Sequence, residues 1–336
     1  MTTNEFFDLW ANEIKTTILK PSTLHCYRVL YRLYVENFEQ IGNAELSAVT
    51  KLDIAKLLNA LLAKGLTPGT CRKIKYVLSG LFSDAEESEL VSTNPCRNVP
   101  IRQPRTERRV LTREEETLLL EELKYTRLYP IVRFMLQTGL RVGEATALRF
   151  SDINMKAGTL LVARTHVYMP DPSTHAMTDV FQEPKTKASM RVIPLLPDTV
   201  ALLKNQMAVR SEETRKAANL GTLVNIPEAG FLVFATKRGG PLRSVNINDT
   251  LANTIKRINS RLVDEGLAPI APISCHALRH TFATRAFECG VKPKAVQKLL
   301  GHVSLQTTMD LYTHVTDDTL RSELMKMKKA LKPCIP

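Results

Sequence analysis

Several signatures of common protein classes are absent from this 336-residue sequence. There is no apolar run of about 18 residues, the length that a membrane-spanning helix needs. The first ten residues, MTTNEFFDLW, lack the basic start and apolar block of a signal peptide. There is also no Gly-rich phosphate loop, and no set of carboxylates spaced to hold the two metal ions used by many phosphate-cutting enzymes. We therefore expect no membrane partner, no cofactor and no metal ion.

Cysteine is sparse and irregularly spaced. Cys275 precedes His276, but adjacent residues of a helix point about 100° apart, which argues against a Cys–His nucleophile. We interpret the thiols as reduced side chains of an intracellular protein. None of these cysteines has the spacing of a zinc-binding motif. The six are Cys26, Cys71, Cys96, Cys275, Cys289 and Cys334.

Positive charge is concentrated in the later part of the chain. The formal net charge is +12, yet residues 1–100 carry 11 basic and 11 acidic residues, whereas residues 101–336 carry 35 and 23. A basic excess favours a nucleic acid partner. It would also suit an acidic membrane surface, but no basic amphipathic segment with a lipidation signal supports that alternative.

The chain is long enough for two domains, and residues 1–98 have the periodicity of a helical one. Helices are expected over residues 24–38, 50–64 and 67–87. The last of these carries Arg72, Lys73 and Lys75 in its early turns and acidic residues at its end. This polarity would orient the helix on DNA, and the alternative is a solvated helix of mixed charge.

Residues 99–110 are expected to form a basic linker. Pro100 and Pro104 keep this segment extended. Its arginines suit a strap across a phosphate backbone, and the alternative is a basic linker without that role. They are Arg102, Arg105, Arg108 and Arg109.

Residues 111–336 are expected to form a second domain, which a capping box of Thr112 and Glu115 opens. Helices are expected to about residue 125 and over 129–138, 197–210 and 245–263. Strands are expected at 159–164, 190–193 and 231–234, with a lengthened connection at 168–175, a hairpin turn at 183–189 and a polar loop at 211–229. The predicted fold is mostly α-helical, with a small antiparallel β-sheet in the C-terminal domain.

A tight turn is predicted at residues 139–144, which read GLRVGE. Gly139 and Gly143 bracket Arg141, so that the backbone can bend sharply there and approach a ligand. A charge on the surface or at a helix end is the alternative explanation for Arg141.

The most informative stretch is residues 273–315. Ser274 is a candidate N-cap, and the helix after it carries His276 and Arg279 on one face because they lie three residues apart. A second helix is expected to end near residue 301, where His302 follows in a turn. A third predicted helix carries Tyr312.

These residue types suit chemistry at a phosphate group. A guanidinium grips phosphate through two hydrogen bonds, an imidazole can move a proton, and a phenol can form a covalent bond to phosphorus. Taken singly, each has a simpler explanation: a packed tyrosine, a solvated His-x-x-Arg pair or a Gly-His helix end. Their occurrence together in this order indicates a shared function.

The motifs HxLRHTFAT, LLGH and TTMxxYTHV closely resemble the C-terminal motif of the tyrosine recombinases, also called the phage integrase family. The family's TGLRxGE motif and its hairpin lysine have counterparts at residues 138–144 and 183–189. The resemblance covers nearly the whole chain, weakly over residues 1–100. Phage and conjugative-transposon integrases are the most similar members.

The resemblance implies a two-domain DNA clamp. Residues 1–98 would form a helical core-binding domain and residues 111–336 an α+β catalytic domain. A C-terminal helix at about 316–332 would pack on a neighbouring subunit. Many such integrases carry a further N-terminal domain that binds arm sites. This sequence begins almost directly with the core-binding segment, so that a simpler recombinase and a missing arm-binding domain both remain open.

By resemblance, Tyr312 attacks the scissile phosphorus and forms a 3′-phosphotyrosyl link. Arg141 and Arg279 hold the non-bridging oxygens and stabilise charge in the transition state. Glu144 supports this site. The covalent link conserves the phosphodiester, so that the reaction requires neither ATP nor metal.

Four further side chains have roles implied by the resemblance. The match to the family's PKT motif selects Lys185 to protonate the departing 5′-oxygen, and Lys187 lies close enough to stay in reserve or to contact DNA. His276 assists proton transfer, and His302 hydrogen-bonds the phosphate.

The partner implied is double-stranded DNA at core recombination sites. The family recombines as a homo-tetramer on DNA, and an accessory DNA-bending or excision factor can take part. Such a protein would be bacterial or phage-encoded and would work in the cytoplasm on the nucleoid. Two other functions remain open: DNA relaxation like that of a type IB topoisomerase, and DNA binding without catalysis on the same fold.

Overall fold

The computed structural model describes residues 1–101, 108–171, 174, 176–184, 189–224 and 226–309. The helix expected at 316–332 lies outside these ranges, as do Arg102, Arg105, Lys185, Lys187 and Tyr312. The chain divides into two compact units. The N-terminal unit comprises Met1–Thr106 with Met169–Thr178, and the C-terminal unit comprises Glu107–Tyr168 with Asp179–Pro336.

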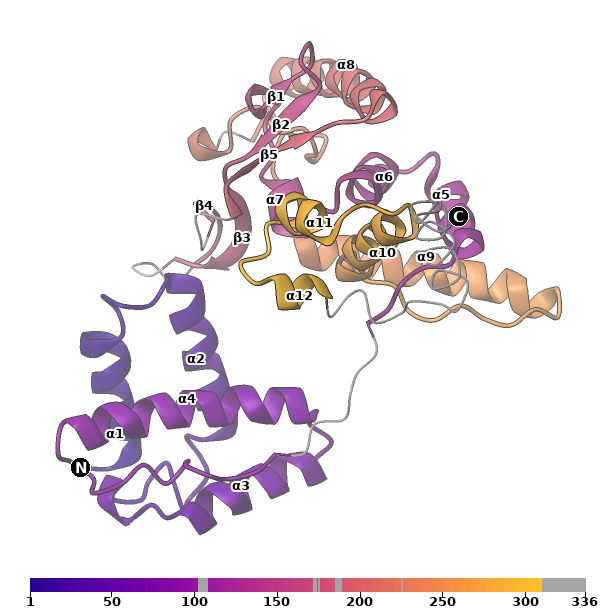
Figure 1. Cartoon of the computed structure of the whole chain (residues 1–336). Coiled ribbons are helices and arrows are strands. Elements are labelled where there is room, and N and C mark those ends of the chain that lie inside the picture. Colours follow the sequence, from indigo (N-terminus) through magenta and orange to yellow (C-terminus); the bar gives the residue numbers. More distant parts are fainter. Residues whose placement is uncertain (102–107, 172–173, 175, 185–188, 225, 310–336) are drawn as a thin grey trace, which may run out of the picture. The chain divides into compact units, whose positions relative to one another are not determined.

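The N-terminal unit is built from helices whose bounds lie close to those expected from the sequence periodicity. The indole of Trp10 is fully buried and donates a hydrogen bond from Nε1 to the Asp84 carboxylate at 2.7 Å, which joins the first helix to the last. Proline opens two of the helices, at the position where a helix tolerates it best. The helices are α1 (Thr3–Leu9), which continues into a π-helical turn (Trp10–Ile14), α2 (Pro21–Tyr34), α3 (Lys51–Ala63) and α4 (Pro68–Glu87) (Figure 1).

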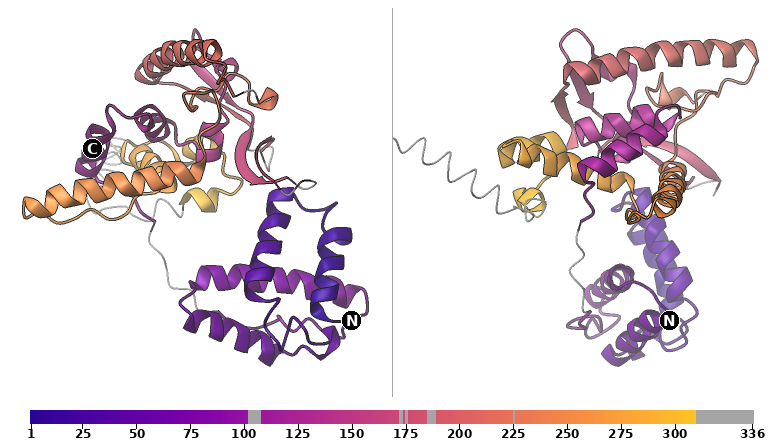
Figure 2. Two further views of the ribbon diagram at one scale, coloured as in Figure 1. Left: turned by 180° about the vertical axis from the view of Figure 1, so that it is seen from behind. Right: turned by 90° about the vertical axis from the view of Figure 1, so that its right-hand side faces the viewer.

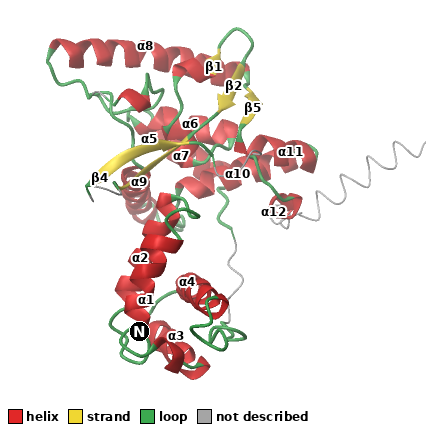
Figure 3. Cartoon of the chain, turned by 90° about the vertical axis from the view of Figure 1, so that its left-hand side faces the viewer, coloured by secondary structure: helices red, strands yellow, loops and turns green. Residues whose placement is uncertain are grey.

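The C-terminal unit holds the helices α5 (Arg113–Leu123), α6 (Leu128–Thr138), α7 (Val142–Thr146), α8 (Pro197–Asn219), α9 (Ser244–Asp264), α10 (Cys275–Glu288), α11 (Pro293–Leu300) and α12 (Leu305–Met309). The predicted capping box of Thr112 and Glu115 is present at the start of α5. One core joins α5, α6, α9 and α10. Figure 3 shows α6, α7, α10 and α11 gathered in one part of this unit. Across the described ranges, no helix combines the length and the apolarity needed to span a membrane.

Within the described residues, the strands form two small sheets, one of three strands and one of two. In the first, β1 (Ile153–Asn154), β2 (Thr159–Val162) and β5 (Arg191–Pro194) pair antiparallel in the order β1–β2–β5. This confirms the strands predicted at residues 159–164 and 190–193. In the second, β3 (Thr165–Pro170) pairs with β4 (Met177–Gln182). These two strands were not predicted, because their segment was interpreted only as a lengthened connection. In both views of Figure 2, α8 lies at the same end of the unit as the three-stranded sheet.

The register of the first sheet places a charged side chain on its buried face. Leu160 pairs with Ile193, and these side chains are 0% and 2% exposed. Because side chains alternate between the faces of a strand, Val162 and its partner Arg191 face the same way. The Arg191 side chain is therefore only 7% exposed.

Two sequence predictions in this unit were wrong. Residues 231–234 do not form a strand; Leu232 makes one isolated bridge with Arg149. The polar stretch after residue 210 continues α8 to Asn219 instead of starting a loop. Ion pairs one turn apart explain the longer helix, because Glu212 pairs with both Arg215 and Lys216.

Candidate active site

The end of α6 brings its turn into close contact with two later helices. Gly139 has φ +65°, in the left-handed region that favours glycine. A Cβ atom built there would lie 2.3 Å from Cδ1 of Phe282 on α10 and 2.8 Å from Cδ2 of Leu300 on α11. Glycine is thus required for both the backbone conformation and the packing, as the bracketing of Arg141 by glycines indicated.

Arg141 is the N-cap residue of α7, and Glu144 lies in the first turn of that helix. The Glu144 carboxylate is 4% exposed and accepts hydrogen bonds from the backbone nitrogen and from Nη1 of Arg141, at 3.0 and 2.8 Å. The Arg141 side chain remains 38% exposed. Glu144 therefore fixes the orientation of Arg141 from the buried side, while part of the Arg141 side chain stays accessible to a ligand.

Arg191 of β5 pairs with the other side of Glu144. Its Nη1 and Nη2 donate to the two carboxylate oxygens at 3.1 and 2.9 Å. Burial raises the pKa of Glu144, but the hydrogen bonds and charges of Arg191 and Arg141 outweigh burial, so that the pKa lies below its ordinary value. No motif in the sequence had indicated a role for Arg191. A signal was available, because Arg191 lies two residues before Ile193 in a predicted strand, so that both side chains are expected on the same, buried face.

Arg279 on α10 is 4% exposed. Its guanidinium donates to the carbonyl oxygens of Gly139 at 2.6 Å and Leu300 at 2.7 Å, which ties α10 to the ends of α6 and α11. Burial and the charge of Arg141 lower its pKa to about 9, with Glu144 acting in the opposite direction. The guanidinium is therefore still charged at neutral pH, close to Arg141.

The charges of the same two arginines, Arg279 and Arg141, act on the pKa of both predicted histidines, His276 and His302. Burial, then Arg279 and Arg141, lower the pKa of His276. The same causes lower the pKa of His302 to about 4. His302 follows Gly301, which ends α11 with φ +65°, and its Nδ1 lies 2.9 Å from Oγ1 of buried Thr308. Both imidazoles are consequently neutral at pH 7 and can accept a proton or donate a hydrogen bond.

Of the linker arginines predicted to follow a DNA backbone, the two that the structure describes have contacts within their own unit. Arg108 donates from Nη1 to the Thr307 carbonyl at 3.5 Å, on α12. Arg109 pairs with Glu115 at 2.6 Å and is 29% exposed. Part of the linker charge thus serves the C-terminal unit itself.

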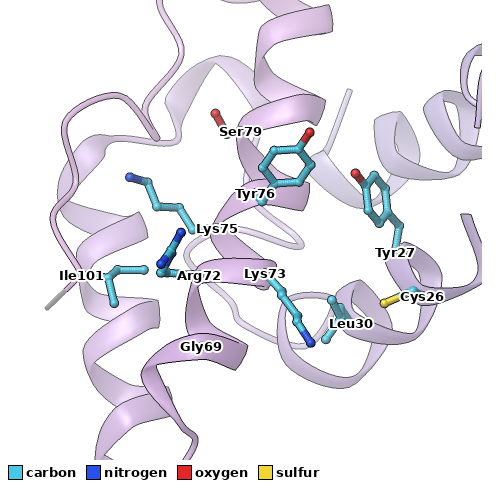
Figure 4. Close-up of a pocket in the computed structure, with 10 residues that line it drawn as sticks. All are labelled: Cys26, Tyr27, Leu30, Gly69, Arg72, Lys73, Lys75, Tyr76, Ser79 and Ile101. Atoms are coloured by element: carbon cyan, nitrogen blue, oxygen red, sulfur yellow. The ribbon is translucent and has the colours of Figure 1, made fainter. Parts of the chain in front are cut away.

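The basic start of α4 lines a pocket of about 780 Å³ against α2 in the N-terminal unit. Figure 4 shows Lys73 extending towards Leu30 of α2, with Tyr76 further along α4. The Tyr76 side chain is 68% exposed. Lys75 donates to the Val99 carbonyl at 2.6 Å, so that its charge is partly used in holding the chain before the linker. Arg72 also lines the pocket.

A model of the phage integrase family matches residues 109–319. The chain belongs to the phage integrase family. A tyrosine recombinase XerC-like protein of Caldanaerobacter subterraneus subsp. tengcongensis is 30% identical over 325 residues, which cover 94% of this chain and 80% of that protein. The transposase from transposon Tn916 of Enterococcus faecalis is 25% identical over 306 residues, covering 89% of this chain and 71% of that protein. This member of the family is a site-specific recombinase.

Solved integrase structures have the same fold. The Tn1549 transposon integrase in complex with a circular intermediate DNA is similar over 97% of this chain and 99% of that one, with a TM-score of 0.79 and 23% identity. A λ integrase dimer bound to a core site is similar over 93% and 95%, with a TM-score of 0.62 and 20% identity. The likeness confirms the predicted fold of this recombinase, mostly helical with small sheets.

Replacing Gly139 by alanine should destabilise the recombinase by about 2–5 kcal/mol, because left-handed strain and overpacking act together. Gly266 is the matched control: it has φ +71° but no atom within 4 Å of a built Cβ, so that Gly266→Ala should cost about 1–2 kcal/mol. Urea unfolding of both variants measures the difference. Equal losses would contradict the close packing at Gly139.

Glu144→Gln should reduce the free energy of unfolding at pH 7 by about 3–5 kcal/mol, because it leaves buried Arg191 without its counter-charge. The native pKa of Glu144 is depressed below 4.5, so that this stability is present above pH 4.5 and is lost as pH falls through the native pKa. The gap between wild type and variant should therefore close in acid. The exposed, paired Glu212 provides the control substitution. A gap independent of pH would contradict the assignment.

Proposed function

We propose that this recombinase integrates and excises a mobile DNA element by cutting and rejoining strands through a 3′-phosphotyrosyl intermediate. The observation that carries the proposal is that Arg279, His276 and His302 all lie close enough to Arg141 for burial and the Arg141 charge together to lower the pKa of each. Two guanidinium groups and two neutral imidazoles can hold the non-bridging oxygens of one phosphodiester and move its protons.

The arginines act on the phosphate in different ways. The partly exposed guanidinium of Arg141 can bind a non-bridging oxygen directly. Arg279 is held by two carbonyl oxygens and adds a fixed positive charge beside it. Because neither group has to reorganise as charge develops, both stabilise the pentacovalent transition state more than the ground state.

Tyr312 and Lys185 are proposed as the nucleophile and the general acid because each matches a sequence motif of the family. The Tyr312 oxygen forms a bond to phosphorus while the bond from phosphorus to the 5′-oxygen breaks. A neutral imidazole, His276, assists removal of the tyrosine proton, and the Lys185 ammonium protonates the departing oxygen. Attack by a 5′-hydroxyl on the phosphotyrosine then reverses these steps, so that no external energy source is needed.

Core-site DNA is the proposed partner. The similar Tn1549 and λ integrases were solved with DNA, and the charge excess of this chain has the matching sign. A λ integrase tetramer was solved on a Holliday junction, with a TM-score of 0.63 to this chain. We extend the proposal to a homo-tetramer assembled on DNA, in which residues 316–332 pack on a neighbouring subunit and an accessory factor can bend the DNA. It would work in the bacterial cytoplasm, on the nucleoid.

Covalent trapping tests the chemistry. Nicked duplexes from the ends of the element, incubated with the protein and a chelator, should yield an adduct that resists denaturing electrophoresis. Tyr312→Phe should abolish it, because the nucleophile is lost. Tyr125→Phe, a change at a side chain that is 93% exposed, should leave it intact. DNA binding without an adduct would support a non-catalytic protein. An adduct with relaxation but no joining of two sites would support a topoisomerase-like activity.

A second test concerns the basic pocket of the N-terminal unit. Replacing Arg72 and Lys73 by alanine should weaken DNA binding and reduce the slope of log affinity against log salt by about 1 for each phosphate that the variant no longer neutralises. Lys51→Ala, at an exposed position of α3 outside this pocket, should change neither. Fluorescence anisotropy across a salt series measures both quantities. Unchanged slopes in the double variant would contradict a role for α4 in phosphate binding.

A further inference from the structure

We propose that Arg191 is a positioning residue that keeps Arg141 available for the phosphate, by occupying the buried Glu144 carboxylate and fixing the end of α11 beside it. This inference rests on the proposed function. Arg191 would not contact the substrate itself. It would orient the motif residues that do.

The hydrogen bonds of Arg191 reach three segments of the site. Nη1 and Nη2 bind Glu144, at the start of α7. Nε donates to the Leu299 carbonyl at 2.7 Å, and Nη1 also donates to the Ser189 carbonyl at 2.9 Å. In sequence, Ser189 lies four residues after Lys185. One buried guanidinium thus joins α7, the last turn of α11 and Ser189.

Arg191 and Arg141 share the hydrogen bonds of one carboxylate, that of Glu144, and this sharing explains the proposed role of Arg191. A carboxylate and a guanidinium prefer a bidentate pair, with two parallel hydrogen bonds. Here Arg191 takes the bidentate position, and Arg141 reaches Glu144 through Nη1 alone besides its backbone nitrogen. Without Arg191, Glu144 is expected to pair bidentately with Arg141. That would neutralise the cation and turn its donors away from a ligand.

The contact with α11 reaches the other side of the site. Leu299 and Leu300 are the last two residues of this helix, where the carbonyl oxygens lack helical partners and a cation is favourable. Arg191 binds the first carbonyl and Arg279 the second. His302 follows two residues later, so that Arg191 and Arg279 together set the position from which His302 faces the phosphate.

The planar fork of arginine matters here more than its charge. A lysine ammonium is a point charge and cannot bind both Glu144 oxygens and two carbonyls in one plane. At metal sites, replacing a residue that orients a ligand lowers affinity or activity on the order of 10–100-fold, and we apply the same scale to a residue that orients a phosphate-binding arginine. We therefore expect Arg191→Lys to lose about 10-fold and Arg191→Met about 100-fold in the single-turnover rate of adduct formation, with DNA affinity changed less than about 3-fold.

The matched control is another buried, ion-paired arginine. Arg210 on α8 is 1% exposed and donates to Glu213 of the same helix and to the Thr236 carbonyl, and neither partner is a motif residue. Arg210→Met should lower the melting temperature but leave the rate per folded molecule unchanged. For Arg191→Met the rate should fall even where the protein is fully folded. If both variants lose rate only in proportion to folded protein, Arg191 is a structural residue and the inference fails.

The pH profile separates positioning from stability. Arg191 helps to depress the pKa of Glu144, so that its loss raises that pKa. The acid limb of the rate profile should therefore shift to higher pH in Arg191→Met and stay in place in Arg210→Met. A uniform loss across pH would overturn the inference.

A crystal structure of Arg191→Met tests the geometry without any reaction. It should show Glu144 in a bidentate pair with Arg141, and the end of α11 displaced. An unmoved Arg141 would overturn the inference. If the wild-type protein forms no adduct, the proposed chemistry fails, and this structural comparison still decides the role of Arg191.

Discussion

The burial of one carboxylate constrains the whole site. A charged Glu144 in the interior is unfavourable unless its oxygens are fully hydrogen-bonded. Among the described residues, Arg141 and Arg191 supply four such bonds. To supply them, α7 must begin directly after Arg141, and β5 must turn its charged residue inward. The position of the sheet and the direction of the exposed guanidinium therefore both follow from this one group.

The cations near Glu144 outnumber it, and this imbalance explains the electrostatics of the site. Burial and the charges of Arg141 and Arg191 lower the pKa of Arg279. Burial and the charges of all three arginines lower the pKa of His302 to about 4. A bound phosphodiester would supply the missing negative charge and raise these pKa values. The free protein thus holds a preorganised arrangement of positive groups that an anion completes.

The helices, the strands at 159–164 and 190–193 and the motif residues could be predicted because each depends on local periodicity or on a short motif. A role for Arg191 could not, because its partner Glu144 lies 47 residues away in sequence and only the sheet register turns Arg191 inward. The predicted end of α8 came too early because polar composition indicated a loop, whereas Glu212 forms ion pairs along the helix. Lys185 and Tyr312 lie outside the described residues, so that their roles rest on their motifs.

The two arginines of the motif are not equivalent, and their contacts explain why. Arg279 is bound to the carbonyls of Gly139 and Leu300, so that it helps to hold α6, α10 and α11 together. Its replacement would disturb the backbone of the site as well as remove a charge. Arg141 is held through one side-chain nitrogen and keeps 38% of its side chain exposed. We therefore expect replacement of Arg141 to remove the proposed phosphate contact and one hydrogen bond to Glu144, whereas replacement of Arg279 would also disturb the packing of three helices.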